Sequence, residues 1–349
     1  MLNLSPNGCS VWVTSSTELA LTPTAVALGK FDGVHRGHQR VIQPICKAAK
    51  VGESVGEKLL LPSPSSTKQH VYSTVVTFDP HPQEFFSGQP RTLLTPLDEK
   101  VQQLFKLGVE QLVLLPFDRE LCSLTPEDFV KKIIVEQLQA TQVSIGNDFR
   151  FGSNRSGTAL EMQILAARYN IPVTIVALET CADDSPVPIN TSDPTRISTS
   201  LIREILENGD VERAKELLGR PYTLIGTVVK GQQLGRTIGF PTANLELPKD
   251  KFIPRLGVYS VRIFSEGVGT VEPMGIGVMN IGNRPTVNGM STTVEVHLLD
   301  WSGDLYGKQL VVHLEKFLRP ETKFASLEAL KAQIQIDCNA AKVFFGSMC

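Results

Sequence analysis

Short apolar runs alternate with segments of helical periodicity over the first 200 residues. The apolar runs are rich in Val, Ile and Leu: TAVALG, VYSTVVTF, EQLVLLPF, TQVSIG and IPVTIVAL. The segments with helical spacing are HRGHQRVIQPICKAAK, TPLDEKVQQLFKLG, TPEDFVKKIIVEQLQ and GTALEMQILAARYN. Alternation of this kind is typical of βαβ units. It predicts an α/β domain with a parallel sheet covered by helices.

Local signals predict where helices begin and where the pattern is interrupted. Thr95-Pro96 and Thr125-Pro126 are each expected to be an N-cap followed by proline at the first helical position. The segment 198–219, STSLIREILENGDVERAKELLG, is expected to be one further helix. The Gly/Ser/Pro-rich stretch 51–70 predicts a mobile insertion, and residues 180–196 predict a polar loop.

The pattern changes after Arg220-Pro221. Apolar and polar residues now alternate with a period of two in YTLIGTVVKG, GVYSVRIF, MGIGVMNIG, TTVEVHLLD and QLVVHLEKFL, with Gly and Asn turns between them. A last helical segment starts near Ser326. This pattern predicts a small antiparallel β-barrel followed by a C-terminal helix. We place the boundary near Gly219, which gives domains 1–219 and 220–349.

Composition and charge narrow the class of protein. The chain has 349 residues, 42% apolar residues and a net charge of -2, which suits two soluble domains and gives no electrostatic reason to expect nucleic-acid or membrane binding. Its six cysteines include no CxxC pair, as expected for reduced thiols. No secretory signal and no apolar stretch of about 20 residues is visible. We therefore expect a cytoplasmic protein, and leave a homo-oligomer open.

The stretch AVALGKFDGVHRGHQRVI joins the first predicted strand to the first predicted helix. Its glycines, Gly29, Gly33 and Gly37, allow close backbone approach at a helix N-terminus, which favours phosphate binding. His35 and His38 are three apart, so both would lie on one face of the first turn and could donate to phosphate oxygens. Two alternatives stay open: a structural capping pair, and a metal site that lacks a nearby third ligand.

Three later segments carry further polar residues: TFDPHP and GNDFRFG follow expected strands, and RISTSLIR begins the last expected helix of the domain. In the last of these, Ser198, Thr199 and Ser200 are candidates to cap a helix. Arg196 and Arg203 could bind anionic oxygens. A capping hydroxyl alone is usually structural, but Arg203 one turn into the same helix favours phosphate binding.

The stretch KGQQLGRTIGFPTANL opens the second domain. It is not a P-loop, because it is one residue short, has Arg236 where that motif has lysine, and lies in an all-β context. Gly235 and Gly239 indicate a flexible loop. Thr242 and Asn244 would point to one face of an extended segment and offer two oxygen ligands suited to Mg²⁺. A turn stabilised by these two side chains is the alternative.

The motifs of the first domain resemble a known family. GKFDGVHRGHQ resembles the GxFDGxHxGHQ signature of nucleotidylyltransferases, specifically the FMN adenylyltransferase module of bacterial FAD synthetases, and GNDFRFG and the ISxxxIR-like helix resemble its later motifs. The resemblance implies a Rossmann-like fold, contacts of His35 and His38 with ATP phosphates, and stabilisation of departing pyrophosphate by Arg203. It further implies ATP or phosphate binding by Gly29, Phe31, Asp32, Gly33, Gly37, Arg196, Ser198, Thr199 and Ser200, and flavin binding by Asn147 and Asp148.

The second domain resembles riboflavin kinases. GRTIGFPTANL resembles the riboflavin kinase signature, and GVYSV, NIGNRPTV, TVEVHLLDWSGDLYG and FLRPETKF resemble the blocks that follow it. The resemblance implies that Thr242 and Asn244 hold Mg²⁺ and nucleotide phosphates beneath a loop with Gly235 and Gly239. It also implies that Glu295 is the catalytic carboxylate. In TVEVHLL, the period of two places Glu295 and His297 on the face opposite Val294 and Val296.

Together the two resemblances predict a bifunctional flavin enzyme. The barrel would phosphorylate riboflavin to FMN, and the α/β domain would adenylylate FMN to FAD with release of pyrophosphate. ATP would be the co-substrate and Mg²⁺ the cofactor of these transferase reactions. The alternatives are an enzyme with only one active module, and a flavin-binding regulatory or carrier protein without turnover.

Overall fold

The computed structural model describes residues 11–51, 69–180, 196–231, 234–266, 271–286 and 289–347. The chain divides into two compact units, Met1–Ser198 and Thr199–Cys349. Segment 199–219, which the sequence assigned to the first domain, thus groups with the second unit, and the functional limits 1–219 and 220–349 stay a prediction. Of the expected mobile insertion at 51–70, residues 52–68 lie outside the described residues.

The first unit is built on a six-stranded parallel sheet, as the alternating pattern predicts. Its strands are β1 (Trp12–Thr14), β2 (Thr24–Leu28), β3 (Tyr72–Asp79), β4 (Gln111–Pro116), β5 (Ala140–Gly146) and β8 (Val173–Val176). The spatial order is β1-β4-β3-β2-β5-β8. The chain therefore runs from β2 to one side through β3 and β4, and then returns to the other side of β2 with β5. Ligands of open parallel sheets bind at such a switch point, outside the carboxyl ends of the strands.

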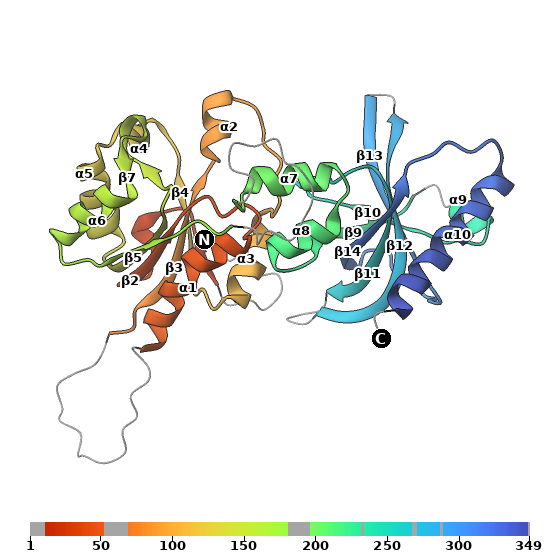
Figure 1. The fold of residues 1–349 in the computed structure, drawn as a ribbon, viewed down its shortest axis with the longest axis horizontal. Helices are drawn as coiled ribbons and strands as arrows, with labels where there is room; N and C mark the ends of the chain where they lie inside the picture. The colour runs from red at the N-terminus through yellow and green to blue at the C-terminus, as the bar shows by residue number, and fades with distance from the viewer. Residues whose placement is uncertain are drawn as a thin grey trace, which may run out of the picture. The chain divides into compact units, whose positions relative to one another are not determined.

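Helices cover both faces of this sheet (Figure 1). In β2, Ala25 and Ala27 belong to the core that includes α1, whereas Val26 and Leu28 belong to the core on the opposite face. The shorter elements and helices are η1 (Thr17–Leu19), α1 (Arg36–Val51), α2 (Pro82–Ser87), α3 (Leu97–Lys106), α4 (Arg119–Ser123), α5 (Pro126–Asp128), η2 (Phe129–Gln137), β6 (Arg150–Phe151), η3 (Ser153–Arg155), β7 (Gly157–Thr158) and α6 (Ala159–Ala167).

Two sequence-based helix boundaries are wrong. Thr125 caps its helix by accepting the Asp128 N–H, as predicted, but the residue at the N-cap of α3 is Pro96 rather than Thr95. The Thr95 hydroxyl instead accepts a hydrogen bond from Gly33. The single helix expected at 198–219 is two helices, α7 (Thr199–Glu207) and α8 (Val211–Leu218). The break occurs because Gly209 adopts a φ of +83° and Asp210 caps a new helix.

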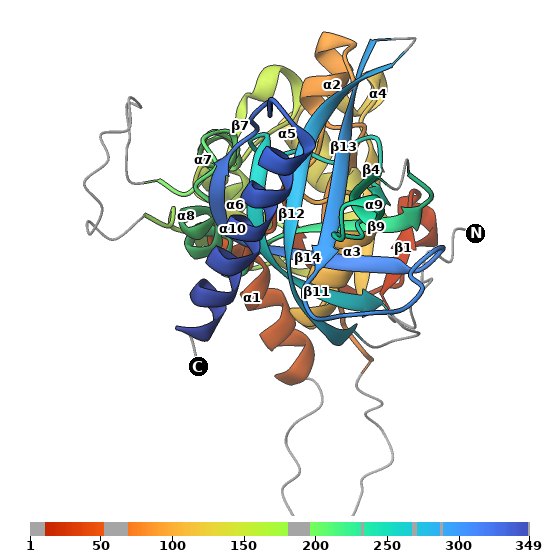
Figure 2. The same ribbon diagram turned by 90° about the vertical axis from the view of Figure 1, so that its right-hand side faces the viewer.

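The second unit contains a closed antiparallel barrel of strand order β10-β13-β12-β11-β14-β9, which confirms the predicted barrel. Its elements are β9 (Tyr222–Val229), α9 (Leu234–Thr237), β10 (Ala243–Glu246), β11 (Gly257–Glu266), β12 (Val271–Thr286), β13 (Gly289–Leu298), β14 (Gln309–Pro320) and α10 (Leu327–Gly346). Ser326 caps α10, as the sequence indicates. Figure 2 shows α10 lying across the barrel, and Cys338 and Ala341 of this helix pack on Val258 and Val278.

Helices α7 and α8 pack beside the barrel. Lys215 of α8 forms a 2.7 Å ion pair with Glu315 of β14, whose side chain is only 4% exposed. Arg262 of β11 is a second cation beside this carboxylate, with its Nε 3.4 Å from Glu315 Oε1. The Arg255 N–H also donates to the Leu206 carbonyl at the end of α7. A buried carboxylate with two cations therefore ties the helical pair to the strands.

Candidate active sites in the two units

The first candidate site is the turn between β2 and α1. Its backbone is unusual, because Phe31 and Val34 have positive φ angles of 47° and 42° and are nonetheless buried. His35 lies just before α1, and its Nδ1 accepts the His38 N–H at 3.3 Å. The two imidazole rings stack with a centroid separation of 3.6 Å, which confirms that they lie on one face. The turn thus presents two histidines at a helix N-terminus, where the helix dipole favours anions.

Neighbouring segments hold this turn in place. The Thr95 hydroxyl accepts the Gly33 N–H at 2.9 Å, and the Thr95 N–H donates to the buried Asp32 carboxylate at 3.2 Å. The Thr77 hydroxyl, on β3, donates to the Lys30 carbonyl at 2.8 Å. Asp32 therefore has a structural role in the turn. The sequence did not indicate that Thr95 supports this turn, since Thr95 lies 62 residues from Gly33.

The three glycines of the motif do different things. Gly33 has a φ of +89°, a conformation that other residues rarely adopt. A Cβ atom on Gly29 would lie 3.0 Å from the Phe31 ring, and one on Gly37 would lie 3.2 Å from the His35 ring. The space beside Gly29 and Gly37 is thus filled by the chain's own rings. Whether their backbone also approaches phosphate stays a prediction.

Positive charge collects around the ends of β2 and β3. Partial burial, followed by the charges of Arg155 and Arg91, lowers the pKa of the Lys30 ammonium. Partial burial, followed by the charges of Arg91 and Lys30, lowers the pKa of His81 to about 4. Burial and the neighbouring cations thus lower the pKa of both Lys30 and His81, and cations gathered in this way favour an anion such as phosphate.

The polar residues after β5 meet the segment 196–198. Asp148 forms an ion pair with Arg196, and the Asn147 N–H donates to the Val176 carbonyl at 2.9 Å. Ser198 ends the first unit, whereas Thr199, Ser200 and Arg203 lie in α7 of the second unit.

Within that second unit, the Arg203 guanidinium lies over the Phe252 ring at 4.8 Å. The approach of Arg203, Thr199 and Ser200 to the histidines stays a prediction, because each unit is described by itself.

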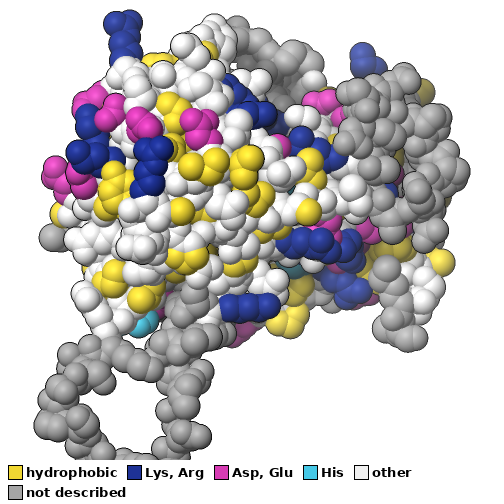
Figure 3. Space-filling view, turned by 60° about the vertical axis from the view of Figure 1, so that its left-hand side comes forward, with side chains coloured by type: hydrophobic (Ala, Val, Ile, Leu, Met, Phe, Trp, Pro, Cys, Tyr) yellow, Lys and Arg dark blue, Asp and Glu magenta, His cyan; other side chains and the backbone are white. Residues whose placement is uncertain are grey.

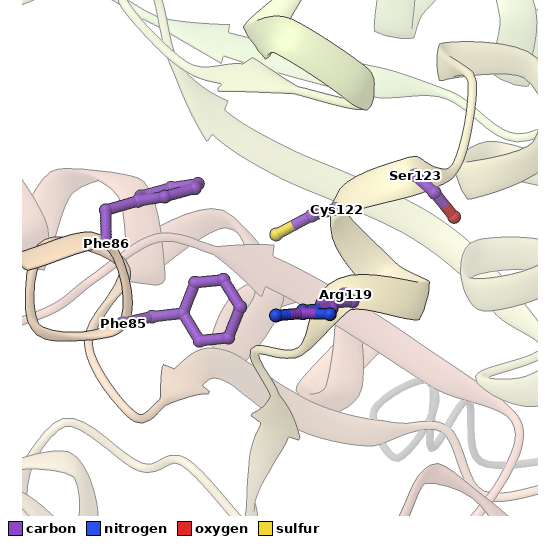
Figure 4. A pocket seen from close by; sticks show the side chains of 5 residues that line it. All are labelled: Phe85, Phe86, Arg119, Cys122 and Ser123. Carbon is purple, nitrogen blue, oxygen red and sulfur yellow. The ribbon is translucent and has the colours of Figure 1, made fainter. Parts of the chain in front are cut away.

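A pocket of about 540 Å³ opens between α2 and α4, beyond the ends of β3 and β4. It is lined by Phe85, Phe86, Arg119, Cys122 and Ser123, and the first three of these converge from facing helices in Figure 4. Phe117 backs the pocket, with ring centroids 5.4 Å from Phe85 and 5.8 Å from Phe86. In the sequence, the feature that could have indicated this pocket is the Phe-Phe pair shortly after TFDPHP.

The second candidate site lies on the outer face of the barrel. Glu295 of β13 is paired in register with Asn244 of β10 on one side and with Asn280 of β12 on the other. The Thr242 hydroxyl donates to the Glu295 carboxylate at 3.4 Å. Val294 and Val296 are buried on the opposite face, as the period of two predicts. The structure therefore brings together Thr242, Asn244 and Glu295, and adds Asn280.

His297 lies one step further along the same face of β13. Its Nδ1–H donates to the Pro241 carbonyl at 2.8 Å, and its ring packs edge-on against Phe240. These contacts fasten the FPTAN segment to the strand that carries Glu295. His297 therefore supports the position of Thr242.

The glycine-containing segment before FPTAN is a tight turn that includes α9. The Gly235 carbonyl accepts the N–H groups of Ile238 and Phe240, and a Cβ atom on Gly235 would lie 2.3 Å from the Phe240 oxygen. Gly239 has a φ of +92° with open space beside it. Gly235 is thus required by the close packing of the turn, and Gly239 is required by its positive φ.

The donor set around Glu295 suits a hard divalent cation. The Thr242 hydroxyl and the Asn244 and Glu295 side chains supply oxygen, which is the ligand type that Mg²⁺ prefers. A Cβ atom on Gly231 would lie 2.3 Å from the Asn244 amide, so this glycine makes room for that side chain. Among the described residues, no group of three or more His, Cys, Asp and Glu side chains is arranged to hold a metal ion.

The described surface has mixed charge. Figure 3 shows basic and acidic side chains in small groups between hydrophobic ones on one face of the molecule. Of the helices in the described residues, none is long and apolar enough to cross a membrane.

Comparisons with known proteins identify the family of each half of the chain. The FAD synthetase family profile matches residues 18–188, and the riboflavin kinase family profile matches residues 218–345. The bifunctional riboflavin kinase/FMN adenylyltransferase of Escherichia coli K12 is 38% identical over 92% of each chain, and that of Haemophilus influenzae is 36% identical over 93% of this chain and 94% of its own.

A solved structure extends the likeness to three dimensions. The crystal structure of a Streptococcus pneumoniae protein described as a macrolide-efflux protein has a TM-score of 0.74 and 28% identity, covering 94% of this chain and 97% of its own. The two family matches show that both enzyme domains are present in this one chain. The chain belongs to the family of bifunctional riboflavin kinase/FMN adenylyltransferases, transferases of flavin cofactor biosynthesis.

Proposed function

We propose that the barrel site phosphorylates riboflavin and that the turn after β2 adenylylates the FMN that results. The observation that carries the kinase assignment is the placement of Glu295 beside Thr242 and between two asparagines. The riboflavin 5′-hydroxyl is neutral, so it needs a group that can orient it and accept its proton. Glu295 serves as that base, and its carboxylate is partly exposed on the barrel face.

A divalent metal is typical of enzymes that transfer groups from ATP, and here we propose Mg²⁺ at Thr242 and Asn244. When bound, the ion neutralises charge on the nucleotide phosphates. The tight turn through Gly235 and Gly239 lies directly before these ligands and covers the phosphates. Asn280 flanks Glu295 from the other strand and orients the substrate hydroxyl.

Adenylyl transfer makes a different demand. The FMN phosphate is already an anion, so it needs no base, and the difficulty is the negative charge that develops around the α-phosphorus of ATP. His35 and His38 donate to this charge from the N-terminus of α1. Lys30 and Arg196 add positive charge nearby. The family resemblance implies that Arg203 and the hydroxyls of 198–200 stabilise the leaving pyrophosphate.

The flavin ring of FMN occupies the aromatic pocket between α2 and α4. Flat aromatic ligands bind where rings can contact them edge-on or in offset stacks, and Phe85 and Phe86 offer both. The pocket lies beyond β3 and β4, the histidines beyond β2, and Asp148 beyond β5. The strand order β4-β3-β2-β5 supports this proposal, because an FMN molecule whose phosphate points at ATP needs its ring pocket beside the phosphate site.

One assay tests both assignments. The full-length chain is incubated with riboflavin and Mg·ATP, and the products are separated by chromatography. Successive formation of FMN and FAD is expected. FMN without FAD would indicate that only the kinase is active, and bound but unconverted riboflavin would indicate a binding protein.

A further inference from the structure

Glu179 is a buried carboxylate behind the histidine turn to which no role has been assigned. Its side chain is 5% exposed. Arg36 Nη2 lies 3.0 Å from one carboxylate oxygen, and Arg40 Nε lies 2.7 Å from the other. These arginines are four residues apart, so both project from one face of the first turns of α1. Glu179 therefore holds the N-terminal end of α1, next to His35 and His38, through two ion pairs.

The contact extends to the turn itself. A Cβ atom on Gly37 would lie 3.2 Å from the His35 ring and 3.9 Å from the Glu179 Cβ. The His35 ring and the Glu179 Cβ therefore both border the space beside Gly37, the residue that precedes His38. The contacts that connect Glu179 to the histidine turn are its ion pairs with Arg36, the residue after His35, and with Arg40, two residues after His38.

The backbone of Glu179 also binds the segment 196–198, which we propose contributes to phosphate binding. The Ile197 N–H donates to the Glu179 carbonyl at 2.9 Å, and Thr180 forms a β-bridge with Arg196. These backbone contacts hold residues 196–198 next to Glu179. One residue ties the start of α1 through its side chain and the Arg196 segment through its backbone.

A surface ion pair would carry little weight, because exposed pairs contribute at most about 1 kcal/mol. Glu179 differs, since its carboxylate is buried while the side chains of Arg36 and Arg40 are 50% and 58% exposed. Removing a buried charge from two cations lets them move toward solvent and relaxes the helix that they hold.

We propose that Glu179 is a positioning residue of the adenylyltransferase. Its carboxylate fixes the first turn of α1, so that the two imidazoles meet the ATP phosphates in the geometry that the transition state requires. This inference rests on the proposed phosphate-binding role of His35 and His38.

The test uses the full-length E179Q variant, which keeps the shape of the side chain and removes its charge. FAD formation from supplied FMN and Mg·ATP is measured while each substrate is varied in turn. We expect kcat/KM for ATP to fall about 10- to 100-fold with a raised KM for ATP, and KM for FMN to stay within about twofold. The riboflavin kinase activity of the same preparation should be unchanged.

Controls separate positioning from folding. A merely structural role would lower kcat through a smaller folded fraction and leave both KM values unchanged, and that result would overturn the proposal. The matched control is E127Q, because Glu127 forms an exposed pair with Arg168 at 3.0 Å in the same unit. It should keep activity within about twofold.

A double-mutant cycle with H38A locates the effect. If Glu179 acts through the histidine turn, E179Q should cost much less in the H38A background than in the wild type. Fully additive losses would overturn the proposal. An H38A variant with unchanged activity would overturn the histidine role on which it rests, whereas a damaged H38A beside an unaffected E179Q would overturn the role of Glu179 alone.

Discussion

In the first unit the candidate catalytic side chains sit on a turn, whereas in the barrel the candidate base sits in the middle of a strand. The turn needs outside support: Thr95 and Thr77 fasten it by hydrogen bonds, and Glu179 grips the helix that follows. Glu295 needs less support from outside its strand, because the pairing of β13 with β10 and β12 already fixes its neighbours.

This difference follows the chemistry of the two reactions. A strand offers one accurately placed carboxylate, which suits a step that needs a base. A turn at a helix N-terminus gathers N–H groups, imidazoles and cations around one point, which suits a step that needs charge stabilisation. If this contrast is correct, a substitution in one site should reduce the activity of that site and leave the activity of the other site unchanged.

The largest effect is expected from Glu295→Gln. Loss of a general base costs roughly 10²- to 10⁴-fold, so FMN formation from riboflavin should fall by that factor. FAD formation from supplied FMN should stay within about twofold, as measured by chromatography in the same preparation. Glu246→Gln is the matched control, since Glu246 is exposed on the neighbouring strand β10. Near-normal kinase turnover would remove Glu295 from the role of base.

The next effect is expected from His38→Ala. One lost donor to developing charge costs about 10²-fold, so FAD formation should fall by about that factor while the kinase is unaffected. His38 is preferable to His35, whose Nδ1 also caps α1. His70→Ala, which removes a ring paired with Glu110, serves as the control. Stoichiometric zinc in protein purified without a histidine tag, lost in the variant, would instead support a metal site.

A smaller effect, on thermal stability, is expected when the barrel domain is produced from residue 220 and not from residue 199. Fragment 220–349 lacks α8, and with it the Lys215 partner of the buried Glu315. Glu315 keeps Arg262 as a partner but loses Lys215 and the packing of α8, so fragment 199–349 should melt roughly 5 °C higher than fragment 220–349. Thermal unfolding followed by circular dichroism measures the difference. Equal midpoints would show that the two helices add nothing to the barrel.

The smallest effect concerns acid stability of the first unit. The pKa of His81 is lowered to about 4 in the folded chain, whereas an unfolded histidine titrates near 6.5. Between these values the unfolded state binds more protons, so the free energy of unfolding should fall as the pH drops from about 6.5 to 4. In His81→Asn, which keeps the cap of α2, part of this loss should disappear.

The readout is the unfolding midpoint of full-length wild type and variant at pH 7.5 and pH 5.0. We expect the wild type to lose a few degrees more than the variant. An equal loss in both proteins would mean that His81 does not contribute to the acid sensitivity.

The sequence predicted what depends on short-range periodicity. The parallel sheet, the barrel, the shared face of His35 and His38, and the outward placement of Glu295 all follow from spacings of two to four residues. Two family signatures then supplied the chemistry that spacing alone left open.

What the sequence did not predict depends on contacts between distant segments. Nothing near Thr95 shows that its hydroxyl will bind Gly33 instead of capping α3. Glu179 reads as an ordinary polar residue until folding brings it between Arg36 and Arg40. The break at Gly209 was visible as a Gly-Asp pair but was outweighed by the helical pattern on both sides.

The two sheets also differ in how they end. The parallel sheet finishes in β1 with three residues and β8 with four, whereas the barrel closes on itself through β9 and β10. Long free edges invite strands from other chains, and short edges or closure remove that template. The consequence is protection against intermolecular aggregation, because neither the parallel sheet nor the barrel offers a long free edge to another chain.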